Sequence, residues 1–411
     1  MNEIVKKLSE MLMGEELDRA LEILPHYDES IRNKSQAERL IALQDIYNAY
    51  VPNTMSREIY SKLYLAMLRS LQKKQTKMAT IQLNENYKGI KGKEYSGIIG
   101  GSDSFTIIGA SGVGKSSAIT RVINLIGGNE MIETTNPYCK IIPCVVVQCP
   151  FDSSVKGMLV EILRVVDGRL ETKYYTNAVR ARATTDMLIC SVSQVALNHI
   201  GLLVIDEIQH IVHHKNGKSL VNCLTQLINN TGISICMVGT PECVPFFVQA
   251  QQLARRSLGL QYGNMEYGIE FRKFCETLFH YQYVKAKTVI DDGMIQWLYE
   301  HSQGNLSMVV SLIHDAQEIA ILDGREVLNL ETLNDAYKQR MALLHDYIRP
   351  KKRTQSVRTK MEPLVLEDME VMADEYEDIS ITTLVARAKN ECRDVAEFLR
   401  EYILVEGVRV C

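Results

Sequence analysis

A glycine-rich stretch at residues 109–116 has the residue types and spacing of a phosphate-binding loop. Its sequence, GASGVGKS, matches the pattern G-x-x-x-x-G-K-[ST]. An apolar run at 104–109 precedes it and a helical pattern at 115–126 follows it, which is the order of strand, loop and helix that phosphate binding requires. Glycines let backbone N–H groups converge on phosphate oxygens, and the following helix adds its positive end. A chance glycine-rich turn would not need this context, so we favour nucleotide binding.

The polar residues around this loop have distinct expected roles. Lys115 is expected to reach the β- and γ-phosphates of ATP, and the hydroxyl of Ser116 to bind Mg²⁺. A second apolar run, LLVIDE, ends in Asp206 and Glu207, where a parallel sheet presents side chains to the phosphates. The expected nucleotide-binding residues are Gly109, Ser111, Gly112, Val113, Gly114, Lys115, Ser116, Ser117 and Asp206, and the expected metal ligands are Ser116 and Asp206.

Two adjacent carboxylates at a strand end suggest two separate tasks. Asp206 is expected to hold Mg²⁺ through its water shell, while Glu207 orients or deprotonates the attacking water. An acidic pair in this position can also merely cap the next helix, but beside a phosphate loop that alternative is the weaker one. The sequence therefore predicts ATP hydrolysis, with Lys115 and Glu207 in the catalytic set.

Thr240 is a further candidate for the catalytic set. It follows the apolar run 233–239, so it would project from the carboxyl edge of the sheet beside the γ-phosphate as a polar sensor. A proline follows it, and a threonine that simply serves as the turn or helix cap ahead of that proline fits the spacing nearly as well.

The elements that must position these residues follow from the pattern of apolar residues. Short, continuously apolar runs bounded by polar or turn residues alternate with helical patterns, as expected of strands that are covered on both faces of a parallel sheet. The predicted strands are 104–109, 141–149, 201–206 and 233–239, and the predicted helices between them are 115–126, 155–167, 178–199 and 219–230. The predicted fold class is α/β, with a doubly wound parallel sheet.

Helical patterns flank this α/β core on both sides. Before it lies a helix with its buried side at 59–71, Ser56 as a possible N-cap, and a lysine-rich cluster at 73–77. After it come helical patterns at 294–302, 306–322 and 330–344, the last with Asn329 as a possible cap. A basic stretch and then an acidic stretch follow, which is typical of a linker or tail. We therefore divide the chain into an N-terminal helical extension (1–95), a nucleotide-binding core (96–290), a helical lid (291–346) and a C-terminal linker and tail (347–411).

Composition restricts the possible functions. The 411 residues, 46% apolar and 23% charged, exclude both a single small module and a disordered chain. A formal net charge of -4 means that any nucleic-acid contact needs a local basic patch. Ten cysteines never form a C-x-x-C pair, so buried reduced thiols are expected instead of zinc. No stretch approaches the roughly 18 unbroken apolar residues of a membrane span, so we expect a cytoplasmic protein without membrane contact.

The order of motifs resembles the AAA+ class of ATPases. LLVIDEIQHI at 202–211 and MVGTPE at 237–242 are particularly similar to the TnsC and TniB regulators of transposition, and the resemblance covers roughly residues 96–345. It implies an AAA+ P-loop parallel-sheet core with a helical lid, and an N-terminal helical extension like the target-binding extension of longer TnsC proteins. It also makes Arg255 and Arg256 candidates for an arginine supplied in trans to a neighbouring subunit's nucleotide, although an exposed arginine pair at a helix end is the plainer alternative.

The resemblance also implies partners. In that family, ATP-bound subunits form a ring or helical filament around double-stranded DNA, receive a target-selection protein at one end and recruit the transposase subunit at the other. A protein of this kind needs ATP and Mg²⁺, and is nucleoid-associated when it is on DNA. The segment SQGNLSMVV lacks the arginine that many AAA+ relatives carry as a second sensor in the lid, which leaves more of the task to the trans arginine. The basic candidates for DNA contact, each of which also fits a solvated surface, are Lys156, Lys173, Arg180 and Arg182.

Two other interpretations share the same catalytic residues. One is an AAA+ helicase loader or initiator, and the other is a P-loop signalling switch without DNA. DNA-dependent oligomerisation would separate the regulator and the loader from the switch. Binding to a transposase would then separate the regulator from the loader.

Overall fold

The computed structural model describes residues 3–99, 104–135, 138–152, 154–211, 217–249 and 259–341. Contacts divide the chain into two units, Met1–Pro350 and Lys351–Cys411, and every described residue belongs to the first. Arg255 and Arg256 lie outside the described residues, as does the tail. The division into extension, core, lid and tail stays a prediction.

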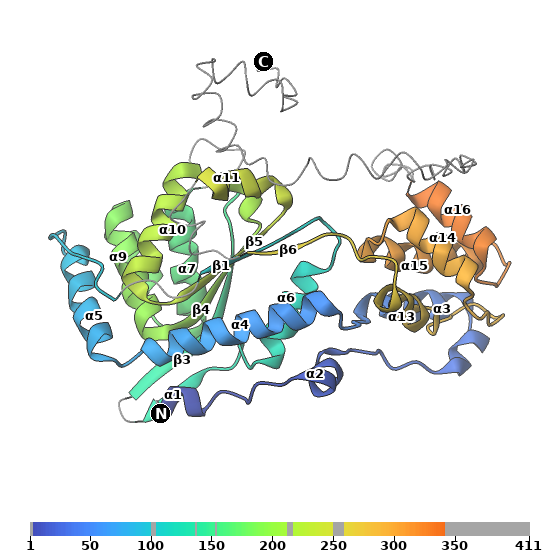
Figure 1. Cartoon of the computed structure of the whole chain (residues 1–411), viewed down its shortest axis with the longest axis horizontal. Coiled ribbons are helices and arrows are strands. Elements are labelled where there is room, and N and C mark those ends of the chain that lie inside the picture. The colour runs from blue at the N-terminus through green and yellow to red at the C-terminus, as the bar shows by residue number, and fades with distance from the viewer. Residues whose placement is uncertain are drawn as a thin grey trace, which may run out of the picture. The chain divides into compact units, whose positions relative to one another are not determined.

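A six-stranded sheet forms the centre of the core (Figure 1). Its strand order is β2-β3-β4-β5-β1-β6, and all neighbours are parallel except the edge strand β2, which is antiparallel to β3. The α/β prediction is confirmed, and the four predicted strands correspond to β1, β3, β4 and β5. The bounds are β1 Phe105–Gly109, β2 Ile132–Thr135, β3 Tyr138–Gln148, β4 Ile200–Asp206, β5 Ser234–Gly239 and β6 Leu260–Tyr262.

The sequence did not predict the two edge strands, β2 and β6, and the reason is physical. Residues of β2 alternate between buried and exposed, and β6 has only three residues, none of them fully buried. Neither strand is therefore a continuously apolar run, and such runs are what predicts the inner strands. The inner strands β1, β4 and β5, in contrast, are buried along nearly their whole length.

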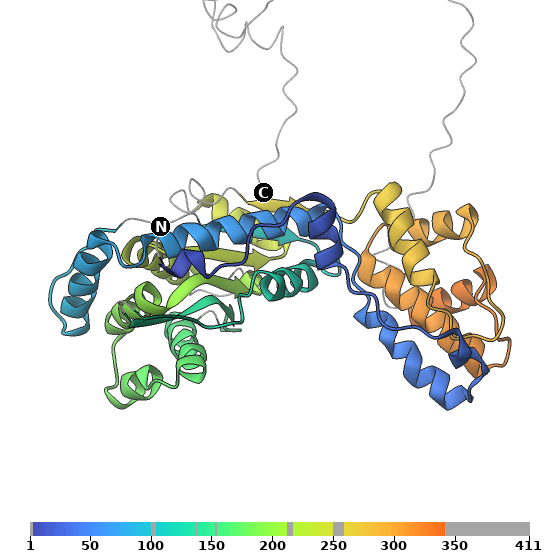
Figure 2. The same ribbon diagram turned by 90° about the horizontal axis from the view of Figure 1, so that it is seen from below.

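Helices cover both faces of the sheet, as Figure 2 shows. On one face α4 and α6 pack with inward side chains of β1, β4 and β5, and on the other α7, α9 and α10 do so. The short helix α8 follows α7, while α5 packs along α9. The bounds are α4 Thr54–Lys73, α5 Lys77–Ile90, α6 Lys115–Leu125, α7 Val155–Leu170, α8 Tyr174–Arg180, α9 Thr185–His199, α10 Gly217–Thr231 and α11 Val244–Gln249.

The prediction of one helix over 178–199 was wrong. The chain forms two helices, α8 and α9, because Arg182 takes a left-handed conformation with φ of 47°. Thr184 then caps α9 by accepting a hydrogen bond from the N–H of Met187.

Helix α4 begins one turn earlier than the sequence suggested. Asn53, not Ser56, is the N-cap: its side chain accepts from the N–H of Ser56 at 2.9 Å, and Ser56 Oγ in turn accepts from the N–H of Asn53 at 2.8 Å. From there Ile59, Leu63 and Met67 recur at helical spacing and are fully buried, which confirms the predicted inner side of this helix.

The lysine-rich end of α4 is not a uniform basic surface. Lys74 is buried, and its ammonium donates to the carbonyls of Ala196 at 2.9 Å and Leu197 at 2.8 Å, near the carboxyl end of α9. Lys73 is half-buried and only Lys77 is exposed. Lys74 therefore ties two helices together and is not available to a partner.

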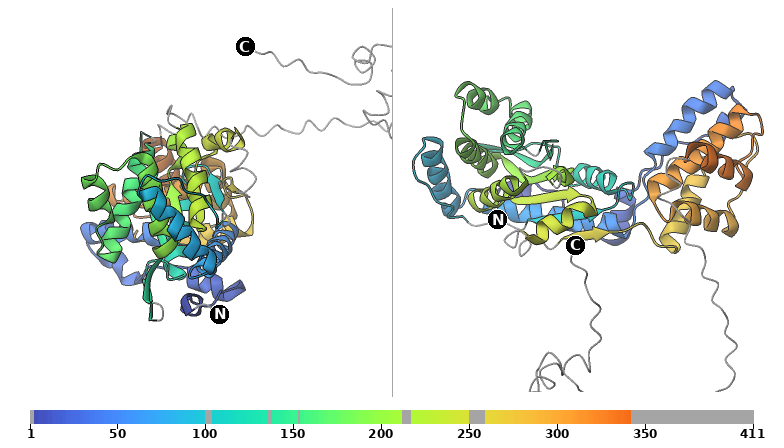
Figure 3. Two further views of the ribbon diagram at one scale, coloured as in Figure 1. Left: turned by 90° about the vertical axis from the view of Figure 1, so that its left-hand side faces the viewer. Right: turned by 90° about the horizontal axis from the view of Figure 1, so that it is seen from above.

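The N-terminal segment packs first on the sheet, then in the lid, and then on the sheet again. Helices α1 (Glu3–Lys6) and α2 (Gly14–Leu21) contribute to the core beside α4, whereas η1 (Glu29–Asn33), α3 (Gln36–Leu43) and η2 (Gln44–Asn48) pack against the lid (Figure 3). Where the segment leaves the sheet and returns to it, Ile23 and Tyr50 exchange two backbone hydrogen bonds of 2.9 and 2.8 Å.

Four helices, which we call the lid from here on, share one hydrophobic core with the middle of the N-terminal segment. Arg39 of α3 is buried there and binds Glu326 through two hydrogen bonds of 2.6 and 2.7 Å. Asn329 caps α16 as predicted, by accepting from the N–H of Thr332. The lid helices are α13 Ile269–Phe279, α14 Asp292–Ser302, α15 Leu306–Leu322 and α16 Leu330–Arg340. This set begins at α13, before the boundary at residue 291 that the sequence predicted for the lid.

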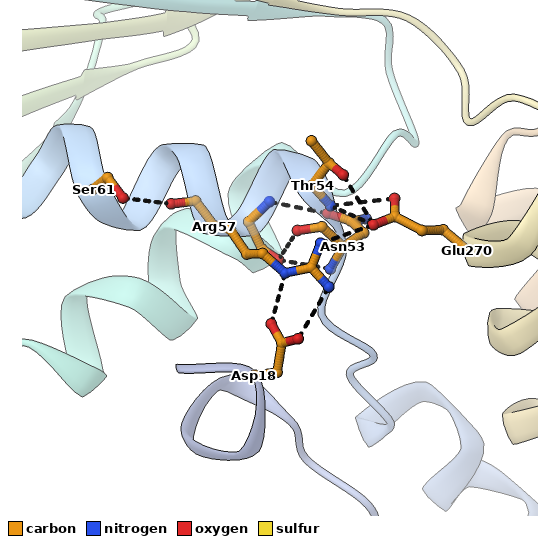
Figure 4. Close-up of polar contacts among 7 residues, drawn as sticks. Asp18, Asn53, Thr54, Arg57, Ser61 and Glu270 are labelled. Carbon is orange, nitrogen blue, oxygen red and sulfur yellow. Dashed lines mark hydrogen bonds and ion pairs between the residues drawn. The ribbon is translucent and has the colours of Figure 1, made fainter. Parts of the chain in front are cut away.

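Arg57 joins three of these elements, as Figure 4 shows. Its guanidinium, on α4, binds Asp18 of α2 through two atoms at 2.7 and 3.1 Å and Glu270 of α13 at 2.9 Å. Glu270 also accepts hydrogen bonds from the N–H and hydroxyl of Thr54, at the start of α4. The first turn of α4 is thereby fixed to both the N-terminal segment and the lid.

The composition led to expectations about the cysteines and about membrane spans, and both concern residues that the structure describes. The eight cysteines among them are all free, and seven are buried, as expected of reduced thiols. Among these residues, none of the helices combines the length and apolar character needed to cross a membrane.

Candidate nucleotide site

The phosphate loop follows β1 at the carboxyl edge of the sheet, and its glycines are required by its geometry. Gly112 and Gly114 have φ of 80° and 95°, a conformation that other residues adopt at a cost. A Cβ on Gly109 would lie 2.8 Å from the carbonyl oxygen of Tyr262. Helix α6 starts at Lys115 without a side-chain cap, so the N–H groups of its first turn stay available to an anion.

Lys115 lies inside this loop with its side chain buried. Its ammonium donates to the carbonyls of Gly109 at 2.6 Å and Ala110 at 2.8 Å. Burial lowers the pKa of Lys115, and the nearby carboxylates of Asp206 and Glu207 oppose that shift by favouring the cation. The sheet thus brings the predicted lysine and the predicted acidic pair, about 90 residues apart in the sequence, into one electrostatic cluster.

The two predicted metal ligands are close enough to interact. Asp206 ends β4, and its carboxylate accepts a hydrogen bond from the N–H of Glu207 at 2.8 Å. Burial raises the pKa of Asp206, while this hydrogen bond, Lys115 and the hydroxyl of Ser116 lower it. A hydroxyl and a carboxylate side by side are the oxygen ligands that Mg²⁺ prefers, so these residues fit that metal.

Glu207 is held in a strained conformation next to Asp206. Its φ is 56°, which is uncommon for a residue with a side chain and recurs at functional sites. Its carboxylate accepts a hydrogen bond from the side-chain amide of Gln209. The two carboxylates of the acidic pair thus have different hydrogen-bond partners, which is compatible with two separate tasks.

Thr240 does not act as the helix cap that its spacing allowed. It precedes the short helix η4 (Pro241–Cys243), yet its side chain makes no capping hydrogen bond. Its Oγ1 is buried and has no hydrogen-bond partner among the described residues. A buried hydroxyl without a partner is costly, so its position at the rim of the site fits a role toward a ligand.

The predicted residues surround a cavity of about 390 Å³, which is within the usual range for small-molecule sites. Ser111, Gly112, Gly114, Ser116 and Ser117 line it together with Lys115, Asp206, Glu207 and Thr240, whereas Gly109 and Val113 lie behind the loop surface. The rest of the wall comes from residues that the sequence did not point to: Tyr47, Ala49, Tyr50, Val51, Asn53 and Met55 of the N-terminal segment, Gln209 and Gly239 of the core, and Phe274, Leu306, Ser307 and Val310 of the lid.

The part of the cavity wall that the N-terminal segment supplies has a recognisable pattern in the sequence. The stretch IYNAYVP, at 46–52, lies within the predicted N-terminal extension, 1–95. Its aromatic residues and the proline that follows mark an apolar loop just before a helix, and an apolar loop of this kind also suits the wall of a ligand site. The structure places Tyr47, Ala49, Tyr50 and Val51 in the wall of the cavity that the phosphate loop also lines.

The four basic candidates for DNA contact lie on neighbouring elements. Lys156 is in the first turn of α7, Lys173 precedes α8, Arg180 ends α8 and Arg182 follows it. All four residues are exposed. Lys156 lies at the start of α7, whereas the other three lie at or beside α8, after the end of α7.

Fold and site together define the AAA+ class of P-loop proteins. The strand that leads into the phosphate loop lies between β5 and β6, β4 with its terminal acidic pair separates β5 from β3, and a helical lid follows. Residues 101–260 match the protein family described as "TniB: Bacterial TniB protein". The predicted resemblance to TniB is thus confirmed over the stretch that holds the phosphate loop, Asp206, Glu207 and Thr240. No curated protein matches the chain in sequence.

Several solved structures share the fold at low identity. The ORC1 protein of Aeropyrum pernix in complex with DNA is 14% identical with a TM-score of 0.42, over 65% of this chain and 65% of that one, which is less than two thirds of its length. Drosophila ORC bound to DNA is 13% identical with a TM-score of 0.46, over 97% of this chain and 83% of that one. Domain III of the Thermotoga maritima replication initiation protein DnaA is 13% identical with a TM-score of 0.35, over 67% and 94%. Likeness at this level says nothing about function.

Proposed function

We propose that this chain is an ATP-hydrolysing regulator of DNA transposition that assembles on target DNA and links a target-selection protein to the transposase. The supporting observation is that the TniB match and the candidate nucleotide site coincide. Residues 101–260 carry the family likeness and also supply the phosphate loop, Ser116 and Asp206, and the Glu207 carboxylate that Gln209 holds by a hydrogen bond.

The residues of the site have separate proposed roles in hydrolysis. The loop N–H groups and Lys115 hold the phosphates, and Ser116 and Asp206 hold Mg²⁺, which neutralises charge on the phosphate oxygens when it is bound. Glu207 takes the proton of the attacking water, and Thr240 donates its free hydroxyl toward the terminal phosphate. Arg255 or Arg256 of a neighbouring subunit would complete the site in an assembly.

DNA binding in this proposal depends on assembly. The chain has a net charge of -4, and the exposed basic candidates on α7 and around α8 are only four. A single subunit therefore makes weak phosphate contacts, which become strong when many subunits repeat them along one duplex.

Negative-stain electron microscopy of the purified chain tests the proposal. With duplex DNA and a non-hydrolysable ATP analogue we expect rings or filaments, and we expect neither with DNA alone nor with the Lys115→Ala variant. Tight DNA binding by a nucleotide-free monomer would contradict the assembly and favour a loader. Nucleotide binding with no DNA-dependent assembly would favour a signalling switch, and binding of the assembly to a transposase separates the regulator from the loader.

A further inference from the structure

The first turn of the lid helix α15 lies directly on the phosphate loop. The side-chain amide of Asn305 donates to the carbonyl of Ser111 at 2.8 Å, and the N–H of Ser307 donates to the carbonyl of Gly112 at 3.0 Å. The other end of the Asn305 side chain accepts from the N–H of Met308 and so caps α15. One side chain therefore starts the lid helix and binds the loop at the same time.

These two contacts fix the orientation of two peptide units in the loop. In a trans peptide the C=O and the following N–H point in opposite directions. When the lid holds the carbonyls of Ser111 and Gly112, the N–H groups of Gly112 and Val113 must point away from the lid contact. Neither N–H has a protein acceptor within the part of the chain that the structure describes, so both are free for an anion.

Two glycines show how closely the lid and the loop fit together. A Cβ on Gly112 would lie 2.5 Å from Oδ1 of Asn305. A Cβ on Gly304, which precedes Asn305 and has φ of 78°, would lie 1.9 Å from the carbonyl of Met265. The N–H of Met265 also donates to the carbonyl of Gly304 at 3.0 Å. The turn that carries Asn305 is thus held between the segment after β6 and the phosphate loop.

We propose that Asn305 is a positioning residue that couples phosphate binding to the position of the lid. The proposal rests on the proposed function, in which the loop binds ATP. A phosphate that accepts from the N–H groups of Gly112 and Val113 polarises the same peptide units and strengthens their carbonyls as acceptors. Bound ATP therefore tightens the lid contacts, and by linkage the lid contacts raise the affinity for ATP.

The variant Asn305→Ser tests this coupling without removing the helix cap. Serine is a good N-cap residue, but its side chain is too short to reach the carbonyl of Ser111 while it caps α15. Asn329→Ser is the matched control, because Asn329 caps α16 in the same way and does not line the nucleotide cavity. A second variant, Ser307→Pro, removes the N–H that donates to Gly112 at a first-turn position where proline is tolerated.

Two measurements are made on the full chain, with thermal unfolding to verify that each variant is folded. Displacement of a fluorescent nucleotide gives the ATP affinity, and hydrogen exchange gives the protection of amides in α15 with and without a non-hydrolysable ATP analogue. We expect Asn305→Ser and Ser307→Pro each to weaken ATP binding about 5-fold, the effect of one hydrogen bond. We also expect both to abolish the ATP-dependent protection of α15, whereas Asn329→Ser behaves as wild type.

The outcomes distinguish this inference from the function on which it rests. If Lys115→Ala loses ATP binding while both lid variants match Asn329→Ser in affinity and protection, the ATP site stands and the coupling is wrong. If the wild type and Lys115→Ala do not differ in ATP affinity, the ATP site is wrong, and the coupling falls with it.

Discussion

Glu207 is the residue whose conformation and surroundings lead to the most direct kinetic prediction. Glu207→Gln keeps the shape of the side chain but removes the proton acceptor, while Asp206 and Ser116 remain as metal ligands. We expect unchanged ATP affinity and hydrolysis slowed by at least ~100-fold, because general-base catalysis contributes that much or more. Steady-state phosphate release and nucleotide binding measure the two effects.

The control for this substitution is Glu242→Gln. Glu242 is an exposed glutamate in η4 that does not line the cavity, so it should hydrolyse ATP at the wild-type rate. The trapped Glu207→Gln state should also form longer-lived assemblies on DNA. Wild-type turnover by Glu207→Gln would mean that the base lies elsewhere.

Lys74 leads to a prediction about pH. Burial lowers the pKa of Lys74 to about 7, from 10.5 for an exposed lysine. Below pH 7 the folded and unfolded chains both hold this proton, and the cost of burying the charge is present in full. Between pH 7 and about 10 the unfolded chain binds more protons at this site, so the free energy of unfolding rises with pH over that window.

The substitution Lys74→Met removes this pH-dependent contribution. We therefore expect the urea midpoint of the wild type to rise more between pH 7 and 9.5 than that of Lys74→Met, while Lys77→Met, an exposed lysine, follows the wild type. Parallel pH profiles for the wild type and Lys74→Met would show that Lys74 titrates normally.

At the scale of elements, the three-way contact of Arg57 predicts how α4 is anchored. Its guanidinium binds two carboxylates at once, which the single ammonium of a lysine cannot reproduce. The group is 38% exposed, so solvent weakens the pairs. We expect Arg57→Ala to lower the free energy of unfolding by about 1 kcal/mol and Arg57→Lys to recover little of that loss.

Urea denaturation at low and high salt measures this contribution. The difference between the wild type and Arg57→Ala should shrink in 1 M salt, where the Debye length is roughly 3 Å. Arg19→Ala is the control, because Arg19 forms a single, highly exposed pair with Glu15 on one helix and should contribute nothing measurable. An equal loss from Arg19→Ala would mean that the three-way geometry of Arg57 is unimportant.

The sequence predicted elements well where the signal lies within the element. The inner strands β1, β3, β4 and β5 are continuous apolar runs, and the polar residues that follow them meet at one sheet edge because parallel strands end there together. This is why Lys115, Asp206 and Thr240 could be placed beside one another from spacing alone.

The sequence failed where the decisive contact is made with a distant element. The apolar residues at 46–52 fit the wall of some ligand site, but their spacing does not show that this wall is completed by residues of α15. Nothing in Arg182 marks the left-handed conformation that separates α8 from α9. Asn53 and Ser56 are both good cap residues, and only the reciprocal hydrogen bonds show which one starts the helix.

At the scale of the whole molecule, the prediction concerns charge and assembly. If many weak phosphate contacts hold the assembly on DNA, then Lys156→Glu and Lys173→Glu should each weaken ATP-dependent binding to all DNA sequences about equally, and should flatten the steep loss of affinity with salt. Filter binding or anisotropy over a salt series measures both effects. Lys338→Glu, an exposed lysine on lid helix α16, is the control with the same change in charge.

These outcomes separate assembly on DNA from general electrostatics. An equal loss from Lys338→Glu would indicate that only net charge matters. A loss that depends on the DNA sequence would instead indicate base contacts at α7 or α8.

The route of the N-terminal segment also determines when this protein is able to fold. Arg39 and Glu326 are 287 positions apart, and Tyr27 donates a hydrogen bond to the carbonyl of Gln282 across 255 positions. During synthesis, residues 27–46 therefore leave the ribosome long before their partners in the lid, and they cannot form these contacts until most of the chain is translated. Contacts between such distant positions close slowly. We therefore expect the lid to complete last. A chain cut short before α15 would lack Leu306, Ser307 and Val310, and so part of the wall of its nucleotide pocket, although every phosphate-loop residue is present.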